Sequence, residues 1–250
     1  MHAGPPSKRL PMTIPLEQHL ARFTLDGGRR EELKWLAAIL MVVDHVNGYL
    51  LGSAYPVMYE LGRLAYPLFA MILAYNLASA GAATLRRVLR KLLLFGAIAQ
   101  PFTMLLRYPT LSGDFTQAAV WWQGNILFTF AIGVAFALVI GRHRPFTPLQ
   151  LGGSVLLAVA GGALVDFRWA GIGYFVSAYY LFVERRTNAL IAFILANIAL
   201  AFENLSLASF LALPILIAAT SGKGALQRRP GLFYAFYPLH LAVIWLANLA

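Results

Sequence analysis

The sequence predicts an all-α membrane protein, a polytopic bundle of about nine transmembrane helices. Apolar runs long enough to cross a bilayer as helices recur along nearly all of its 250 residues. The chain is 60% hydrophobic and 12% charged, with a mean hydropathy of +0.68, which is more apolar than a soluble core of this size requires. Basic residues gather in alternate loops between these runs, as in the cytoplasmic loops of membrane proteins.

The chain divides into a polar N-terminal tail and one long apolar domain. Residues 1–32 are basic and rich in proline, and we expect them to form a cytoplasmic tail rather than a cleavable signal peptide. Apolar residues recur at helical spacing between Pro15 and Leu25, which predicts a helix along the inner membrane surface, with an unstructured tail as the open alternative. Residues 33–250 are expected to form a single transmembrane domain.

Charge clusters and turn residues divide this domain into candidate spans. The sixth to eighth are shorter than the roughly 20 residues that a helical bilayer crossing needs, so their ends stay open. The spans are residues 33–52, 57–79, 88–107, 118–140, 148–166, 170–184, 188–202, 207–220 and 232–250.

The basic residues are distributed asymmetrically along the chain. Of the 20 lysines and arginines, only Arg107 and Arg168 lie in the loops that alternate with the basic ones, and Arg63 lies within a span. This asymmetry predicts a cytoplasmic N-terminus and an outward-facing C-terminus. Because topology explains the net charge of +10, nucleic acid is excluded as the main partner. The absence of cysteine excludes disulfides, thiolate catalysis and thiolate metal sites.

Polar side chains from five spans are expected at a similar depth in the membrane. Asp44 and His45 lie within the first apolar run, where a carboxylate costs about 2.5 to 3.5 kcal/mol. At about 1.5 Å of rise per residue, five polar groups fall roughly 12 to 20 Å from the inner surface. They are Asp44, Arg63, Gln100, Asn125 and His240. The charged groups indicate a shared functional cavity, while ordinary hydrogen-bonded helix packing stays open for Gln100 and Asn125.

Helix geometry assigns roles within this layer. Adjacent residues point about 100° apart, so Asp44 is not placed to orient His45 as a residue four positions away would be. We expect Asp44 to pair with Arg63, which leaves His45 free for proton transfer. Two histidines and one carboxylate at membrane depth are a poor set of ligands, so no metal is expected.

Five motifs resemble those of the TraX family, in the same order and over nearly the whole membrane domain. The Asp-His pair and the Tyr-Pro-Leu-His motif are the most specific. The segments are LKWLAAILMVVDHVNG from residue 33, GRLAYPLFA at 62–70, AIAQPF at 97–102, GNILFTFAIG at 124–133 and FYAFYPLHLAVIW at 233–245. The resemblance marks Asp44, His45, Gly62, Arg63, Pro67, Gln100, Pro101, Asn125, Tyr237, Pro238 and His240.

This family is similar to the F-pilin acetylase and looks like a branch of the transmembrane acyltransferases. The resemblance implies a multi-pass acetyltransferase of the bacterial inner membrane. It would move an acetyl group from cytosolic acetyl-CoA to an outer-face amine, such as the N-terminus of a pilin-like protein, or to a hydroxyl group of a protein or glycan. The catalytic residues implied are His45 as general base, with Asp44, Arg63 and His240. The residues expected to bind substrate and CoA are Gln100, Asn125, Tyr237, Arg86, Arg87, Arg90 and Lys91.

Two other function classes stay open at this stage. Asp44 and His45 could relay protons in a secondary transporter, although no internal repeat is visible. A non-catalytic assembly factor for an envelope appendage is the third class. Direct binding of acetyl-CoA would separate the acetyltransferase from both. The identity of the acetyl acceptor, and whether transfer is direct or passes through acetyl-histidine, also stay open.

Overall fold

A computed structural model describes residues 18, 23–108, 123–141, 147–229 and 231–249. Most of this part is helical, and an isolated bridge between Gly124 and Val165 is its one β-type pairing, which confirms the all-α prediction. The helices are α2 (Gly27–His45) continued by the π-helical turn η1 (Val46–Leu50), α3 (Pro56–Gly62), α4 (Ala65–Ala78), α5 (Ala82–Arg107), α7 (Ile126–Ile140), α8 (Pro148–Gly162), α9 (Arg168–Glu184), α10 (Thr187–Asn204), the 3₁₀ turn η3 (Ala208–Leu211), α11 (Ala212–Ala218) and α12 (Leu232–Ala247).

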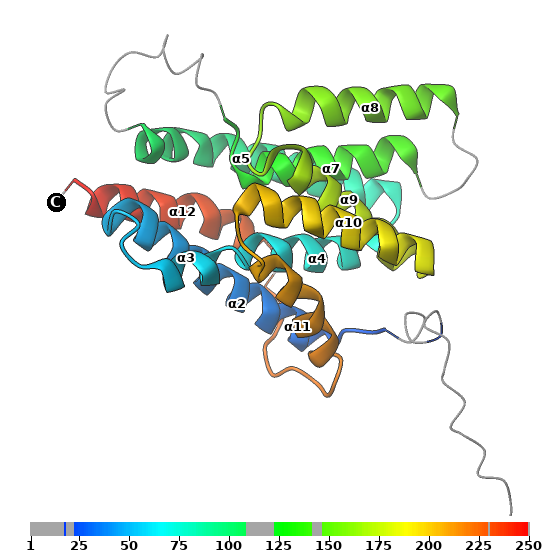
Figure 1. Cartoon of the computed structure of the whole chain (residues 1–250), viewed down its shortest axis with the longest axis horizontal. Coiled ribbons are helices and arrows are strands. Elements are labelled where there is room, and N and C mark those ends of the chain that lie inside the picture. The colour runs from blue at the N-terminus through cyan, green and yellow to red at the C-terminus, as the bar shows by residue number, and fades with distance from the viewer. Residues whose placement is uncertain (1–17, 19–22, 109–122, 142–146, 230, 250) are drawn as a thin grey trace, which may run out of the picture.

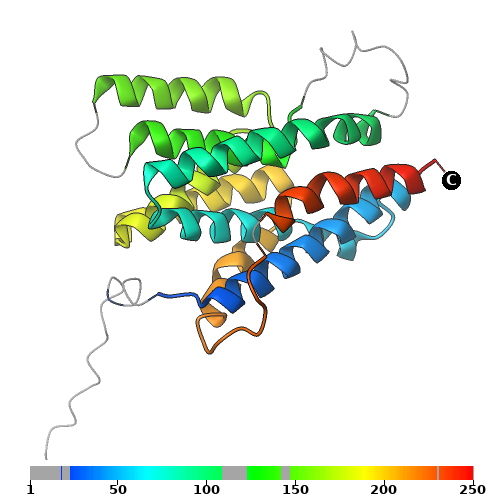
Figure 2. The same cartoon turned by 180° about the vertical axis from the view of Figure 1, so that it is seen from behind.

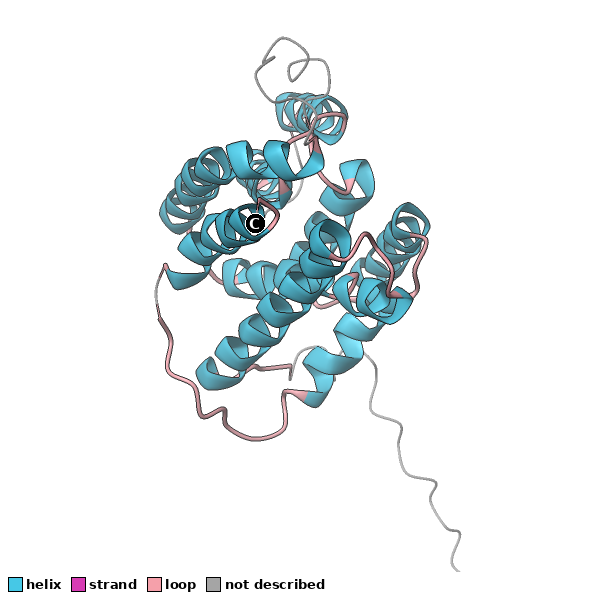
Figure 3. Ribbon diagram, turned by 90° about the vertical axis from the view of Figure 1, so that its left-hand side faces the viewer, coloured by secondary structure: helices cyan, strands magenta, loops and turns pink. Residues whose placement is uncertain are grey.

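The helices are arranged in layers (Figure 1). Helix α8 lies at one edge beside α7, and α2, α3 and α11 lie at the opposite edge. Helices α4 and α9 pack against each other in the centre, and α12 packs along α5 (Figure 2). The axes of several helices are roughly aligned, as the view along the bundle shows (Figure 3). The largest fully buried side chains include Tyr66 of α4 and Tyr174, Phe175 and Tyr179 of α9.

A helical segment overlaps each predicted span, with different bounds. Three helices of the described part are long and apolar enough to cross a membrane: Pro56–Ala78, Ala82–Arg107 and Thr187–Asn204. The shorter apolar helices are Ile126–Ile140, Pro148–Gly162, Ala208–Ala218 and Leu232–Ala247. Large apolar side chains remain exposed on several helices, as expected where lipid covers the surface. Nine crossings and the orientation of the termini stay predictions.

The first helix begins six residues before its predicted span. The side chain of Asp26 caps it by accepting the N–H of Gly28 at 2.9 Å. The predicted surface helix over 15–25 is wrong at its C-terminal end, because the segment from Phe23 to Asp26 is not helical. The Phe23 ring packs 5.5 Å from that of Phe182, so burial in the bundle replaces contact with the membrane surface. Apart from residue 18, the rest of that predicted helix lies outside the described residues.

Two interruptions of regular helix position the polar layer. Helix α2 passes into the π-helical turn directly after His45, a type of distortion that is frequent at functional sites. Within this turn the buried Asn47 side chain donates to the carbonyl of Tyr55 at 3.1 Å and accepts its N–H at 3.0 Å. The predicted second span divides at Arg63 into α3 and α4.

Candidate functional site

The two histidines that are predicted at membrane depth, His45 and His240, form a hydrogen-bonded pair. Nδ1 of His45 on α2 lies 2.8 Å from Nε2 of His240 on α12, and the two rings are nearly parallel, at 4°. Nδ1 of His240 lies 3.1 Å from the carbonyl oxygen of Phe236, one helical turn earlier. The prediction that these two helices bring their histidines to one layer is therefore confirmed.

The hydrogen-bond pattern assigns the proton positions in the neutral pair. A carbonyl oxygen only accepts, so Nδ1 of His240 carries the proton of that ring. Nε2 of His240 then accepts from Nδ1–H of His45. Nε2 of His45 is left with its lone pair. The pair therefore presents one basic nitrogen, on His45, with His240 fixing its tautomer.

The predicted ion pair between Asp44 and Arg63 is confirmed. The Arg63 guanidinium donates to the Asp44 carboxylate, and both side chains are about four-fifths buried. Gly62 permits this approach, because a Cβ atom at that position would overlap the Asp44 side chain. The Tyr59 ring lies 4.5 Å from the Arg63 guanidinium carbon and supports it from the other side. The Asp44 carboxylate therefore balances the charge of Arg63, and His240 rather than Asp44 orients the His45 ring.

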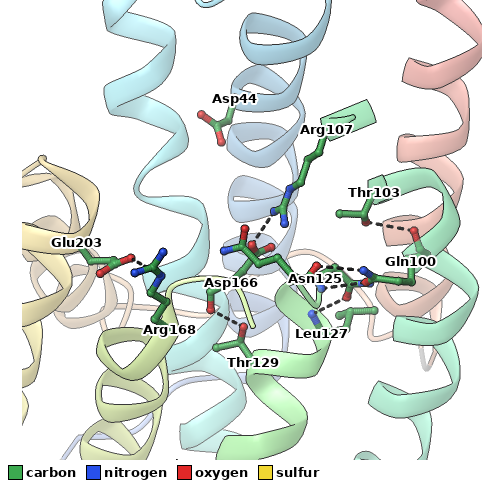
Figure 4. A network of polar contacts seen from close by, with 12 residues as sticks. Asp44, Gln100, Thr103, Arg107, Asn125, Leu127, Thr129, Asp166, Arg168 and Glu203 are labelled. Atoms are coloured by element: carbon green, nitrogen blue, oxygen red, sulfur yellow. Dashed lines mark hydrogen bonds and ion pairs between the residues drawn. The ribbon is translucent and has the colours of Figure 1, made fainter. Parts of the chain in front are cut away.

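Asp44, His45 and Arg63 line a cavity of about 480 Å³, here named the outer cavity. It contains a second ion pair, in which Arg107 at the end of α5 donates to Asp166 at 2.6 Å (Figure 4). This pair was not predicted from the sequence, because Arg107 was expected to be an ordinary loop cation. The sequence feature that could have predicted the pair is an acidic and a basic residue at the predicted outer ends of two spans. The lining includes Asp44, His45, Tyr49, Arg63, Tyr66, Arg107, Asp166, Glu203, Asn204 and Tyr237.

Gln100 and Asn125 belong to the junction of α5 and α7, as Figure 4 shows. The Asn125 amide nitrogen donates to Gln100 Oε1 at 2.9 Å and to the carbonyl of Gly96 at 2.8 Å. Its Oδ1 caps α7 by accepting from Leu127. Neither residue lines the outer cavity. This arrangement favours the helix-packing alternative for both amides.

A second cavity, of about 370 Å³, adjoins the first and is named the inner cavity. Its rim carries the cations Arg30, Lys34, Arg228 and Arg229, and its walls are mainly apolar. Met41, Ile126 and Tyr237 line both cavities, so the two spaces share these walls. Tyr237 also lies against His240, with ring centroids 5.3 Å apart. The histidine pair therefore lies beside the boundary between the cavities.

The basic residues expected to bind CoA lie elsewhere on the surface. Together with Ala83, they line a third hollow, of about 400 Å³, on the first turns of α5. The basic residues are Arg86, Arg87, Arg90 and Lys91. Lys91 Nζ lies 5.6 Å from the centre of the Tyr234 ring, which lines the inner cavity.

Comparison with known proteins identifies the family. The family described as TraX protein matches residues 29–248. The chain belongs to the TraX family. This TraX-family chain is 31% identical over 229 residues to a protein TraX of Escherichia coli, covering 87% of this chain and 86% of the relative. It is 27% identical over 239 residues to a probable fimbrial assembly protein FimC, serogroup H1, of Dichelobacter nodosus, covering 87% and 95% of the two chains. No solved structure matches.

The remaining motif residues of this TraX-family chain are prolines inside helices. Pro67 lies in the first turn of α4, where its missing N–H leaves no helical bond unmade. Pro101 and Pro238 lie within α5 and α12, the two helices that carry Gln100 and His240. In the described part of the chain, no three histidines, aspartates or glutamates group closely enough to hold a metal ion.

Proposed function

We propose that this protein is an acetyltransferase of the bacterial inner membrane, which moves an acetyl group from cytosolic acetyl-CoA to an acetyl acceptor at the outer face. The observation that carries the proposal is that two cavities of different chemistry share walls beside one histidine pair. The inner cavity offers a route for the donor and the outer cavity a place for the acetyl acceptor. A reaction at their boundary transfers the acetyl group without moving CoA across the membrane.

The chemistry needs one base, which the His45–His240 pair supplies. Nε2 of His45 removes a proton from the amine or hydroxyl of the acetyl acceptor as that group attacks the thioester carbonyl. The C–S bond of the resulting tetrahedral intermediate then breaks, and the CoA sulfur takes the proton from His45. His240 holds the required tautomer of His45 throughout.

The negative oxygen of the intermediate needs hydrogen-bond donors. Arg63 Nε and Arg107 Nη1 are buried and have no hydrogen-bond partner in the described part of the chain. Both guanidiniums line the outer cavity together with His45. They therefore suit the stabilisation of this negative oxygen. The Asn125 amide, in contrast, is engaged at the α5–α7 junction.

The acetyl acceptor is proposed to be a pilin-like protein. The name of the Dichelobacter nodosus relative, a probable fimbrial assembly protein, supports this choice. The test incubates the purified full chain in nanodiscs with labelled acetyl-CoA and a panel of peptide amines and sugar hydroxyls. Label on one acetyl acceptor, with equal release of CoA, supports the proposal. Solute flux across sealed vesicles without transfer would indicate a transporter, and neither result would indicate an assembly factor.

The proposal also requires the inner cavity to face the cytosol. The charge asymmetry predicts this orientation, with the N-terminus inside and the C-terminus outside. Alkaline phosphatase, which is active only outside the cytoplasm, is fused at each end. We expect activity from the C-terminal fusion alone. Activity at the N-terminus alone would overturn both the orientation and the cytosolic route for CoA.

A further inference from the structure

The rim of the inner cavity concentrates positive charge from two distant parts of the chain. Arg30 and Lys34 come from the first turns of α2, and Arg228 and Arg229 come from the segment before α12. One carboxylate, that of Glu31, lines the cavity with them and accepts from Lys34 at 2.8 Å. Arg228 and Arg229 are exposed, so their guanidiniums are accessible from the aqueous side. This rim suits a ligand with several negative charges.

The interior of the inner cavity has the opposite character. Its walls are mainly apolar, with side chains from four helices: Phe69 and Leu73 of α4, Val88 and Leu92 of α5, Phe130 of α7 and Phe236 of α12. The cavity continues to Met41 and Tyr237, which also line the outer cavity where His45 lies. A ligand that fits both parts has a polyanionic head and a slender, uncharged arm that ends near His45.

A strap, defined as residues 221–229, fixes two of the rim cations in place. Its backbone N–H groups at Gly224 and Ala225 donate to the carboxylates of Asp26 and Glu32, at 3.0 and 2.7 Å. Gly224 also packs so closely on Gly28 that a Cβ atom on either residue would overlap the other's backbone. Figure 2 shows this connection passing the start of α2 on its way to α12. The strap therefore docks on α2 and presents Arg228 and Arg229 at the rim.

The basic cluster on α5 lacks these features. Its hollow is lined by one helix, through Ala83, Arg86, Arg87, Arg90 and Lys91. None of these residues lines the inner cavity, and Ala83 is the one apolar residue among those that line this hollow in the described part of the chain. The cluster can attract anions, but it offers no path for a thioester.

We propose that the inner cavity is the binding site of the acyl donor. The rim formed by Arg30, Lys34, Arg228 and Arg229 holds the phosphates of the CoA nucleotide, and the apolar interior holds its pantetheine arm. This assignment rests on the proposed acetyl transfer, and it replaces the expected role of the α5 cluster. It makes the strap part of the donor site.

The experiment compares two matched pairs of charge removals in the full chain. One variant carries Arg228→Gln and Arg229→Gln, and the control carries Arg86→Gln and Arg87→Gln. Calorimetry measures binding of CoA and of pantetheine, which lacks the phosphates. We expect the strap variant to bind CoA about 10- to 100-fold more weakly, from the loss of charge-assisted hydrogen bonds. The control should change CoA affinity by less than about threefold. Pantetheine binding should be the same in both.

The other outcomes are equally informative. A loss of CoA affinity in the α5 variant alone, or an equal loss in both, would overturn the assignment while leaving acetyl transfer intact. Failure of the unaltered chain to bind CoA would overturn the proposed function with it. A second variant, Leu73→Trp, fills the interior without changing charge and should weaken CoA and pantetheine alike. Unchanged binding of both ligands by this variant would show that the arm does not enter the cavity.

Discussion

The outer and inner cavities differ in how the charges of their lining residues are balanced. In the outer cavity each strong cation has an acid beside it, since Arg63 pairs with Asp44 and Arg107 with Asp166. The rim of the inner cavity has four cations and a single carboxylate, over apolar walls. Paired charges hold a reacting centre in place without attracting a permanent ion, whereas surplus cations favour a bound polyanion. The contrast indicates chemistry on one side of the histidine pair and donor binding on the other.

The largest effect is expected from a variant that impairs acetyl transfer but leaves CoA binding intact. His45→Ala removes the basic nitrogen and should lower acetyl transfer by about 10² to 10⁴, because a general base acts in the transition state. CoA affinity should stay unchanged, since the inner cavity is intact. Labelled-acetyl transfer and calorimetry on the purified variant check the two parts of this prediction.

His240→Ala provides the internal control. It removes the group that orients His45, so kcat should fall by less than in His45→Ala, with little change in KM for acetyl-CoA. A larger loss in His240→Ala than in His45→Ala would make His240 the base. Full activity in both variants would remove the histidine pair from the mechanism.

The next effect concerns the stability of the outer cavity. Asp44→Asn leaves the largely buried Arg63 guanidinium without its counter-charge and should lower the free energy of unfolding by about 3 to 5 kcal/mol. Adding Arg63→Gln should recover part of that loss, because the stranded charge is gone. Thermal unfolding in detergent measures both variants. If the two substitutions destabilise additively, the pair contributes no coupling energy.

The contrast between the cavities also marks the limit of sequence reasoning. Asp44 and Arg63 could be paired in advance because a charge in an apolar run needs a partner, and helical rise placed both at one depth. The pairing of Arg107 with Asp166 was harder to predict, since charged residues at the ends of spans can contact water and need no partner in the protein. The hydrogen bond between His45 and His240 joins residues 195 positions apart, and helix packing alone determines which nitrogens meet.

The inner cavity was missed for a related reason. Its cations occupy two segments that each look like ordinary positive loops, and only the docking of residues 221–229 on α2 brings them together. Arg86 and its neighbours formed the denser cluster in the sequence and therefore attracted the CoA assignment. Cations that are close together in the sequence need not converge on one point in the structure, and an anion-binding site requires cations that converge in space.

A smaller effect is expected when the docking of the strap is loosened. Gly224→Ala introduces a Cβ atom that overlaps the backbone of Gly28 and Arg29, so the strap must shift. CoA affinity should fall about tenfold as the rim cations move, while kcat at saturating acetyl-CoA stays unchanged. Gly173→Ala in α9 is the matched control, because no atom within 4 Å meets its new Cβ. A fall in kcat for Gly224→Ala would instead link the strap to the chemical step.

The smallest expected effect is a pH dependence at the contact between Asp26 and the strap. Hydrogen bonds from the backbone N–H groups of Gly224 and Gly28 lower the pKa of the Asp26 carboxyl below its ordinary value of 3.8. Because the pKa is depressed in the folded state, the stabilisation is complete above that value and disappears as the pH falls through the folded pKa. Limited proteolysis with an acid-active protease should therefore show the strap becoming more sensitive as the pH drops below about 4. Asp26→Asn lacks the charge at every pH and should show a smaller change, whereas an identical pH profile in the two proteins would assign the docking of the strap to Glu32 and the glycine contact instead.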